Sequence, residues 1–237
     1  MEYEKVIKGR FISRPNRFVA ICTIEGRKVE AHVKNTGRCR EILIPGADIW
    51  LQDHIGHMNG RRLRYSLICV EKTTERGMKL INIDSQAPNA AVHEALRNGV
   101  ITLPGMKGPY MVKPEQRYKD SRFDFYVKDA DGKEAYAEVK GVTLENKGVC
   151  MFPDAPTERG KKHIIGLADA LGNGYLAYII FVIQMEFDGY FTPNKDTDPG
   201  FADALMQAAG SGVGVLAYDC KVAPGEINIS DKVIIKL

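Results

Sequence analysis

The residues with the clearest chemical potential are two acids and a lysine in the second half of the chain. Asp124 lies in the run Arg122–Phe125, and Glu138 and Lys140 lie in the run Ala137–Gly141. Residues two apart in a strand face the same side, so Glu138 and Lys140 should project together. Carboxylate oxygens suit Mg²⁺ or Mn²⁺, and a nearby lysine stabilises negative charge on a phosphate. The trio predicts metal-assisted phosphodiester hydrolysis with Asp124, Glu138 and Lys140 as catalytic residues.

The spacing of these residues also predicts how they meet. A turn signal at 129–132 predicts a hairpin in which residue i pairs with about residue 261 − i. Asp124 then lies close to opposite Glu138, with Cβ atoms roughly 5 Å apart. Two carboxylates at that distance repel unless they share a proton or bind a cation. The alternative is an ordinary cross-strand ion network on a surface hairpin, because an isolated Glu-x-Lys sequence is common.

The segments around the trio alternate between helical and strand patterns, which is typical of an α/β domain with a mixed sheet. Thr157 and Gly172 mark the expected start and end of the central helix. The expected helices are 89–98, 157–171 and 198–209, and the expected strands are 110–118, 122–127, 134–142, 175–184, 214–220 and 227–237.

The first third of the chain has a different character. It shows short alternating strands separated by turns, at 17–24, 27–33, 48–52, 64–72 and 80–84. About five such strands without a convincing helix indicate a small barrel, for which the OB-fold is the leading candidate, and OB-folds commonly bind oligonucleotides. We therefore expect an α+β or α/β protein of two domains, an OB-like barrel at 1–84 and a mixed-sheet domain at 85–237, which the resemblances given below imply to be nuclease-like.

Composition limits the class of protein. Residues 1–76 hold 15 Lys+Arg against 9 Asp+Glu, a net charge of +6, while the remainder carries −3, which indicates a polyanion-binding surface in the first third. The five cysteines are widely scattered without a C-x-x-C pair, which argues against a zinc ribbon and fits reduced thiols. No apolar run of about 18 residues and no secretory h-region are present, so we expect a cytoplasmic protein without a membrane partner.

Basic residues on turns are the candidates for nucleic-acid contact, because loop arginines on a barrel are well placed to meet phosphates. A second group lies at the start of the helix at 157–171, where backbone N–H groups also bind anions. The alternative there is a capped, solvated helix start. Stacking on a base is an alternative role for Phe11 or Phe18, for which core packing is the favoured role. The candidates are Arg14, Arg17, Lys34, Arg38, Arg40, Arg159, Lys161 and Lys162.

The arrangement of the trio resembles the PD-(D/E)xK nuclease superfamily, whose metal site uses an Asp and then Glu/Asp-x-Lys on the next strand. Asp124, Glu138 and Lys140 match this pattern residue by residue. The resemblance also implies an acidic metal ligand on the first helix, for which Glu94 is the candidate and Glu115 a rival; either is also explained as a solvated surface residue.

A longer resemblance spans nearly the whole chain, to the sugar fermentation stimulation protein A (SfsA) family. It implies an OB-like domain joined to a nuclease-like domain, and DNA binding with little sequence preference. Nothing in these residues explains a link to sugar. The resemblance rests on the runs 14–19, 35–41, 82–89, 121–125, 138–143 and 152–160.

The sequence thus favours a DNA-binding protein, with RNA as an alternative ligand, that carries a Mg²⁺- or Mn²⁺-dependent nuclease site. The alternative is a non-catalytic, sequence-nonspecific DNA-binding or regulatory protein linked to sugar metabolism. A sugar-related enzyme or adaptor is favoured only by the family name. The absence of a helix-turn-helix or zinc-finger pattern argues against a sequence-specific transcription factor. The sequence does not specify an oligomeric state.

Overall fold

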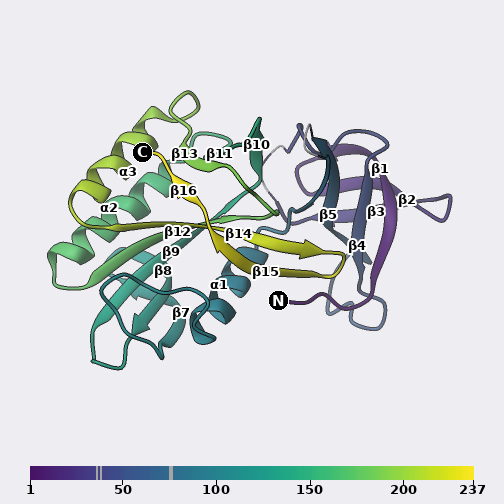
Figure 1. Cartoon of the computed structure of the whole chain (residues 1–237). Coiled ribbons are helices and arrows are strands. Elements are labelled where there is room, and N and C mark those ends of the chain that lie inside the picture. The colour runs from purple at the N-terminus through teal and green to yellow at the C-terminus, as the bar shows by residue number, and fades with distance from the viewer. Residues whose placement is uncertain (36, 38, 75–76) are drawn as a thin grey trace.

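The computed structural model describes residues 1–35, 37, 39–74 and 77–237. The chain forms two lobes, with the strands of the first third on the right of Figure 1 and the helices and larger sheet on the left. Among the described residues, no helix is long and apolar enough to cross a membrane.

The first lobe is a closed ring of strands. The strand order is β3-β2-β1-β4-β5-β6, and an additional parallel pairing of β3 with β5 closes the first five strands. This arrangement confirms the expected OB-like domain. Its strands are β1 (Val6–Asn16), β2 (Val19–Ile24), β3 (Arg27–Val33), β4 (Asp48–Asp53), β5 (Tyr65–Thr74) and β6 (Gly77–Asn82).

The strand β1 has no counterpart among the strands expected from the sequence. It contains Gly9 and Pro15, and both residue types weaken a strand pattern. Gly9 is nevertheless required in the barrel, because a Cβ there would lie 2.7 Å from the carbonyl oxygen of Thr23 and 2.9 Å from a methyl of Leu51. The absent side chain lets β1 pack closely against its neighbours.

The second lobe is built on a six-stranded mixed sheet of order β15-β14-β12-β9-β8-β7. The strand β9 pairs in parallel with β12 and antiparallel with β8, as expected for a mixed sheet. The strands are β7 (Met111–Tyr118), β8 (Ser121–Lys128), β9 (Glu134–Val142), β12 (Leu176–Ile183), β14 (Gly214–Ala223) and β15 (Glu226–Lys232), and the helices are α1 (Ala87–Arg97), α2 (Glu158–Gly172) and α3 (Pro199–Gly210).

Helices cover both faces of this sheet. Alternate residues of β12 face opposite layers: Ile179 and Phe181 share a core with α2 and α3, and Ile180 and Val182 share one with α1. Because both faces are covered, β12 is a continuous apolar run. Glu138 lies beside Ile179 in the sheet, so the acidic residue sits in the interior of the domain.

A second, smaller sheet was not expected from the sequence. The expected last strand, 227–237, divides between the main sheet, through β15, and this small sheet. Its strands have only two to four residues, too few to show an alternating pattern. They are β10 (Leu144–Asn146), β11 (Val149–Phe152), β13 (Tyr190–Pro193) and β16 (Ile234–Ile235).

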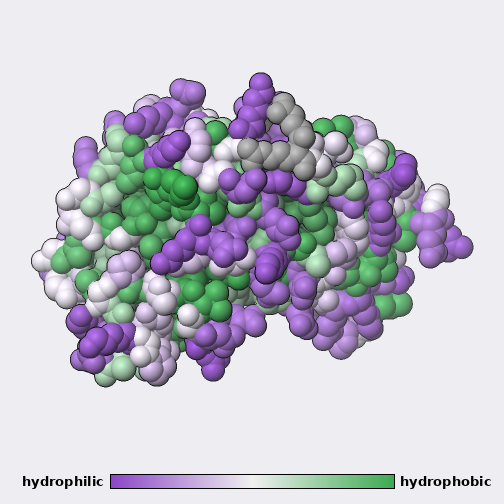
Figure 2. All heavy atoms as spheres, in the orientation of Figure 1, coloured by the Kyte–Doolittle hydropathy of each residue, from purple (hydrophilic) through white to green (hydrophobic). Residues whose placement is uncertain are grey.

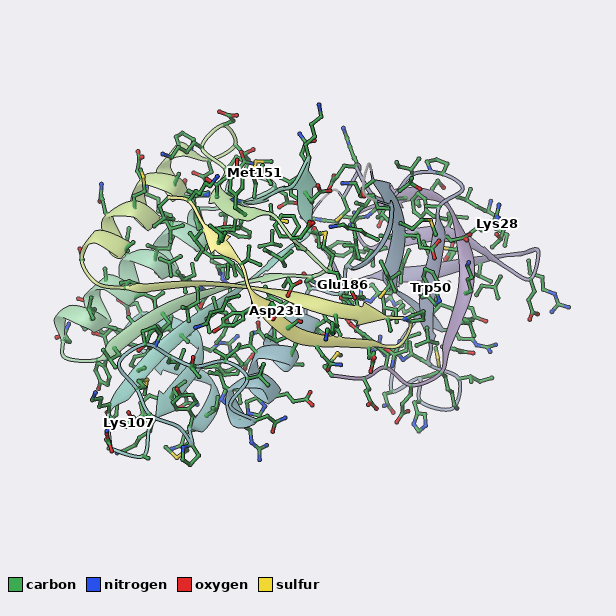
Figure 3. All side chains as sticks on the ribbon, in the orientation of Figure 1. Lys28, Trp50, Lys107, Met151, Glu186 and Asp231 are labelled. Carbon is green, nitrogen blue, oxygen red and sulfur yellow. The ribbon has the colours of Figure 1, made fainter. Side chains whose placement is uncertain are left out.

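The two lobes are joined by specific contacts. The N-terminal segment leaves the barrel and pairs with the second lobe, where the N–H of Tyr3 donates to the carbonyl of Gly225 at 2.7 Å. Lys79 of β6 donates to the carbonyl of Glu186 at 3.0 Å, and Glu186 lies between the lobes in Figure 3. Hydrophilic residues spread over this central region on the face shown in Figure 2.

Candidate active site

The site begins where the β8–β9 hairpin ladder ends. The last pair in register is Phe125 with Ala137, one residue away from the expected register, and the next positions are Asp124 and Glu138. There the side chain of Asp124 replaces the backbone as acceptor, because its Oδ2 takes the N–H of Val139 at 2.8 Å. The carboxylate of Asp124 is therefore held beside the backbone of the residue that follows Glu138.

Glu138 and Lys140 share one side of β9, as the strand period predicts. The Oε1 atom of Glu138 accepts from the Nζ of Lys140 and contacts the Nδ1 of His163 on α2. Its Oε2 atom is buried and has no hydrogen-bond partner among the described residues. One oxygen of this carboxylate is thus held by two neighbours, and the other is left without a partner.

The two carboxyl groups are shifted in opposite directions. Burial, and then the negative charge of Glu138, raise the pKa of Asp124 above its ordinary value. Burial also opposes ionisation of Glu138, but the contacts with His163 and Lys140 outweigh it and hold the pKa of Glu138 below its ordinary value. Glu138 is therefore a stabilised carboxylate, whereas ionisation of Asp124 is unfavourable. A cation bound between them would stabilise the ionised form of Asp124.

Two residues that the sequence did not single out hold this pair. Asn89, in the first turn of α1, donates to Asp124 Oδ1 at 2.7 Å, and His163 contacts Glu138. For His163 a signal existed, since the buried positions Gly160, His163 and Ile164 form the inner face of α2. Asn89 offered no comparable signal, because its partner lies 35 residues away.

A glycine after Lys140 lets α1 approach the sheet. A Cβ at Gly141 would lie 2.9 Å from Pro88 of α1 and would collide with the side-chain oxygen of Gln184. The amide of Gln184 in turn donates to the carbonyls of Asn82 and Asp84, each at 3.1 Å. This close packing sets the position of Asn89, one residue after Pro88.

The structure places the other acidic candidates away from the pair. The carboxylate of Glu94 is 54% exposed and lies 2.8 Å from the N-terminal ammonium group of Met1. Glu115 is exposed on β7, with its carboxylate 3.6 Å from Arg122. Neither contacts Asp124 or Glu138, so the helix residue brought to the site is Asn89.

The residues present fit a divalent cation with few protein ligands. Among the described residues, no group of three or more His, Cys, Asp or Glu side chains is arranged to hold a metal. Mg²⁺ commonly binds through one or two carboxylates and completes its shell with water and phosphate oxygens. Asp124 and Glu138 supply two carboxylates, and the partnerless Oε2 of Glu138 is an oxygen available for such an ion.

The basic candidates of the barrel divide into two groups. Arg14 donates to the carbonyls of Arg17, Asn35 and Gly37 at 2.6–2.7 Å, so its guanidinium group organises the loop. Lys34 pairs with the fully buried Asp84. Arg17 and Arg40 are exposed, and Arg38 lies outside the described residues.

The start of α2 is capped from within the chain. The hydroxyl of Thr157 accepts from the N–H of Gly160 at 3.0 Å, as a helix cap does. Arg159 and Lys162 are exposed there, and Lys161 is half-buried. The cap satisfies one of the free N–H groups at the helix start. The basic side chains of Arg159, Lys161 and Lys162 lie on the turn before His163.

A barrel loop reaches this side of the second lobe. A side chain at Gly37 would collide with the carboxylate of Asp154, which lies in the loop before α2. Lys34 of the same barrel loop reaches Asp84, just before α1. The barrel loop therefore runs past the beginnings of the two helices that contact Asp124 and Glu138.

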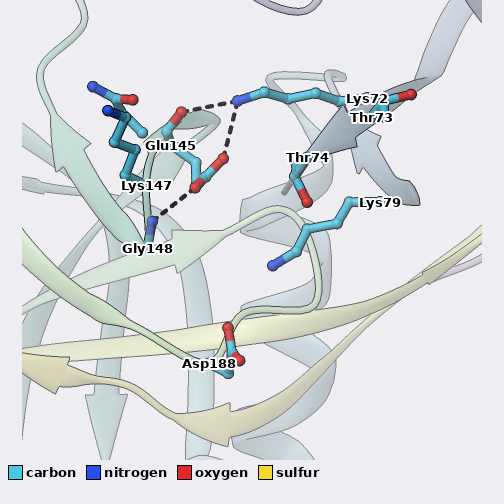
Figure 4. Close-up of a pocket in the computed structure, with 9 residues that line it drawn as sticks. Lys72, Thr73, Thr74, Lys79, Glu145, Lys147, Gly148 and Asp188 are labelled. Carbon is cyan, nitrogen blue, oxygen red and sulfur yellow. Dashed lines mark hydrogen bonds and ion pairs between the residues drawn. The ribbon is translucent and has the colours of Figure 1, made fainter. Parts of the chain in front are cut away.

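A separate polar pocket lies between the lobes (Figure 4). It has a volume of 300 Å³ and is lined by lysines from both lobes, Lys72, Lys79 and Lys147. Glu145 accepts from Lys72 at 3.0 Å and from the N–H of Gly148 at 3.0 Å. This pocket does not include Asp124, Glu138 or Lys140, and its ion pair joins β5 to β10.

Fold and site together define an OB-like barrel fused to an α/β domain with a buried carboxylate–lysine cluster. Comparison with known families agrees with this division: residues 12–83 match the SfsA N-terminal OB domain, and residues 86–226 match the sugar fermentation stimulation protein RE domain. The chain belongs to the SfsA family.

Individual relatives match over nearly their full length. The sugar fermentation stimulation protein homolog of Desulfitobacterium hafniense (strain DSM 10664 / DCB-2) is 47% identical over 237 residues, covering 100% of this chain and 99% of that protein. The homolog of Clostridium beijerinckii is 48% identical over 233 residues, covering 98% of each. The solved structure of Pyrococcus furiosus SfsA in complex with Ca²⁺ has a TM-score of 0.87 and 29% identity, covering 100% of this chain and 98% of that one.

Proposed function

We propose that this chain binds DNA and hydrolyses its phosphodiester bonds with a divalent metal ion, Mg²⁺ or Mn²⁺, held by Asp124 and Glu138. The observation that carries the proposal is the buried carboxylate pair, in which Glu138 holds Lys140 through Oε1 and keeps an Oε2 that has no partner among the residues the structure describes. Surface ion networks do not leave such an oxygen buried, because desolvating it without a partner costs free energy.

Each residue of the cluster has a distinct role in this proposal. Asp124 and Glu138 bind the cation, and Lys140 stabilises the negative charge that develops on the attacked phosphate. Asn89 and His163 are positioning residues, because each orients one carboxylate through a direct contact. When bound, the metal supplies charge neutralisation and activation of the attacking water.

Two further observations support the proposal. The related structure from Pyrococcus furiosus is described as a complex with Ca²⁺, a cation of the kind that carboxylate oxygens bind. The exposed basic residues Arg17, Arg40, Arg159 and Lys162 lie on the barrel and at the start of α2, where they attract a phosphate backbone. We do not include Glu94 among the ligands, since its carboxylate pairs with the N-terminus.

The test is a cleavage assay on labelled DNA and RNA with Mg²⁺, Mn²⁺ or EDTA. We expect metal-dependent cleavage in the wild-type protein, and its loss in Asp124→Asn and Lys140→Ala with nucleic-acid binding retained. Glu94→Gln is the matched acidic control and keeps the wild-type rate. Binding without cleavage in every metal would instead favour a non-catalytic DNA-binding protein, and equal cleavage by Asp124→Asn would assign any activity to a contaminant.

A further inference from the structure

A second pocket lies on the barrel, at the turn between β1 and β2. It has a volume of 470 Å³ and is lined by Phe18, Val19, His32, Arg61, Arg62 and Leu63. Phe18 is 49% exposed, which contradicts its expected place in the core, whereas Phe11 is buried as expected. The sequence pattern missed this because Phe18 lies two residues after the end of β1, in the turn and outside the strand alternation.

The exposed ring of Phe18 is held in place by its own turn. The side-chain oxygen of Asn16 accepts the N–H groups of Phe18 and Val19 at 2.9 and 3.0 Å. The guanidinium group of Arg17 lies 5.1 Å from the centre of the Phe18 ring. An apolar ring fixed at a surface beside a cation is a platform on which another flat group stacks.

The charges around this platform are available to an anion. Arg61 and Arg62 are exposed, and neither forms an ion pair with any residue that the structure describes. Burial, and then the charges of Arg61 and Lys34, hold the pKa of His32 below its ordinary value and so favour its neutral ring. The pocket thus combines an aromatic face, an uncharged imidazole and two free cations.

A chain of contacts runs from the Phe18 turn to the loop before α2. Arg14 donates to the carbonyl of Arg17, beside Phe18, and to the carbonyls of Asn35 and Gly37. Gly37 in turn packs against Asp154, in the loop before α2. One guanidinium group therefore ties the Phe18 turn to the barrel loop that reaches the helix carrying His163.

We propose that this pocket holds one base of a single-stranded nucleic acid, stacked on Phe18, with Arg61 and Arg62 on the flanking phosphates. Aromatic platforms in positively charged grooves are how single strands are bound without sequence preference. A duplex keeps its bases paired and stacked inside, so it cannot place a base on Phe18. The inference rests on the proposed function and deepens it: the pocket selects unpaired strands for the carboxylate site.

The test compares three fluorescent ligands in EDTA, where no cleavage occurs: an oligothymidine strand, an abasic strand of the same length and charge, and a duplex. We expect the wild-type protein to prefer oligothymidine over the abasic strand by about tenfold, as loss of stacking on one aromatic predicts. Phe18→Ala abolishes this preference, and Phe18→Trp keeps it. Met78→Ala, at a residue of β6 that is 66% exposed, is the matched control and keeps the wild-type preference.

The arginines have a different signature. Arg61→Ala and Arg62→Ala weaken binding of all three ligands and each lowers the slope of affinity against salt by about 0.7 on a single strand. If Phe18→Ala weakens all three ligands equally, or none, the base pocket is overturned. If Phe18→Ala leaves the strand preference unchanged while the separate variant Asp124→Asn abolishes cleavage, the pocket alone is overturned. If the wild-type protein binds none of the three ligands, the proposed function is overturned as well.

Discussion

The two domains use their charged residues in opposite ways. In the α/β domain, Asp124 and Glu138 are turned inward, and each is held by a residue of a neighbouring helix. In the barrel, the basic residues divide: Lys34 and Arg14 bind groups of the protein itself, whereas Arg17 and its exposed neighbours face solvent. A buried charge is fixed in position by its partners but loses hydration free energy. An exposed charge stays hydrated and accessible to a ligand.

The charge of a residue alone therefore does not identify it as a nucleic-acid-binding residue. Arg14, near the end of β1, and Arg17, in the turn that follows, lie three residues apart, yet Arg14 donates to backbone carbonyls and Arg17 lies over an aromatic ring. Substitutions of inward and outward charges should therefore have different consequences for activity, stability and binding.

The largest effect is expected at the inward carboxylate. Glu138→Gln removes the negative charge that Lys140 and His163 hold, and with it a ligand for the cation. We expect the rate of metal-dependent cleavage to fall by about a hundredfold to a thousandfold, the usual loss when one preorganised electrostatic group is removed. The measurement is single-turnover cleavage with Mn²⁺. Asp131→Asn, at an exposed turn, should keep the wild-type rate, and equal losses in both variants would contradict a specific role for Glu138.

A buried ion pair at the domain junction gives the next effect, on stability. Asp84 is fully buried and pairs with Lys34, so Asp84→Ala leaves a half-buried lysine without this partner. We expect the free energy of unfolding to fall by about 3 kcal/mol, measured by urea titration. Asp169→Ala removes a carboxylate that is 45% exposed and pairs with Lys119, and should cost less than about 1 kcal/mol. Equal costs would show that burial is not what distinguishes the two pairs.

Arg14, at the end of β1, and Arg17, in the turn after it, should separate stability from binding. Arg14→Ala leaves three carbonyls without a donor and should lower the free energy of unfolding by about 2 kcal/mol. Arg17→Ala should change stability by less than about 0.5 kcal/mol but weaken binding of oligothymidine. Urea titration and fluorescence anisotropy on the same two proteins check this. A stable Arg14→Ala protein would mean that its contacts do not organise the loop.

The smallest effect is expected at Glu145, whose contacts between the lobes make the free energy of unfolding depend on pH. Burial opposes ionisation of Glu145, but the Gly148 N–H and Lys72 outweigh it, so the pKa of Glu145 lies below its ordinary value of 4.5. The unfolded chain then binds the proton more readily than the folded one. The contribution of this pair is present above about pH 4.5 and is lost as the pH falls through the lowered pKa.

We therefore expect Glu145→Gln to lower the free energy of unfolding by about 1 kcal/mol at neutral pH and to reduce its loss between about pH 5 and 3. Urea titrations at the two pH values measure both quantities. A variant whose acid dependence matches that of the wild-type protein would show that other carboxyl groups account for it.

Much of the architecture was predictable because it depends on local patterns. The hairpin of β2 and β3, the strand β9 and the capped helix α2 follow from alternation, turn residues and an N-cap, all within one segment. The strands of the small sheet were not, since two to four residues carry no period. The register of the β8–β9 hairpin came within one residue of the expected one, and Asp124 and Glu138 occupy the next opposed positions as expected, because the turn specifies a hairpin register to about that precision.

By itself the sequence determined that Glu138 and Lys140 face the same side of one strand and that an acid lies across the hairpin, because a strand repeats every two residues. Only the tertiary structure decided that Asn89 and His163 hold the carboxylates, that Arg14 and Lys34 are committed inside the protein, and that the ring of Phe18 is exposed. The physical reason is that these contacts join residues far apart in the chain. Their free energies depend on burial and on partners that no local pattern records.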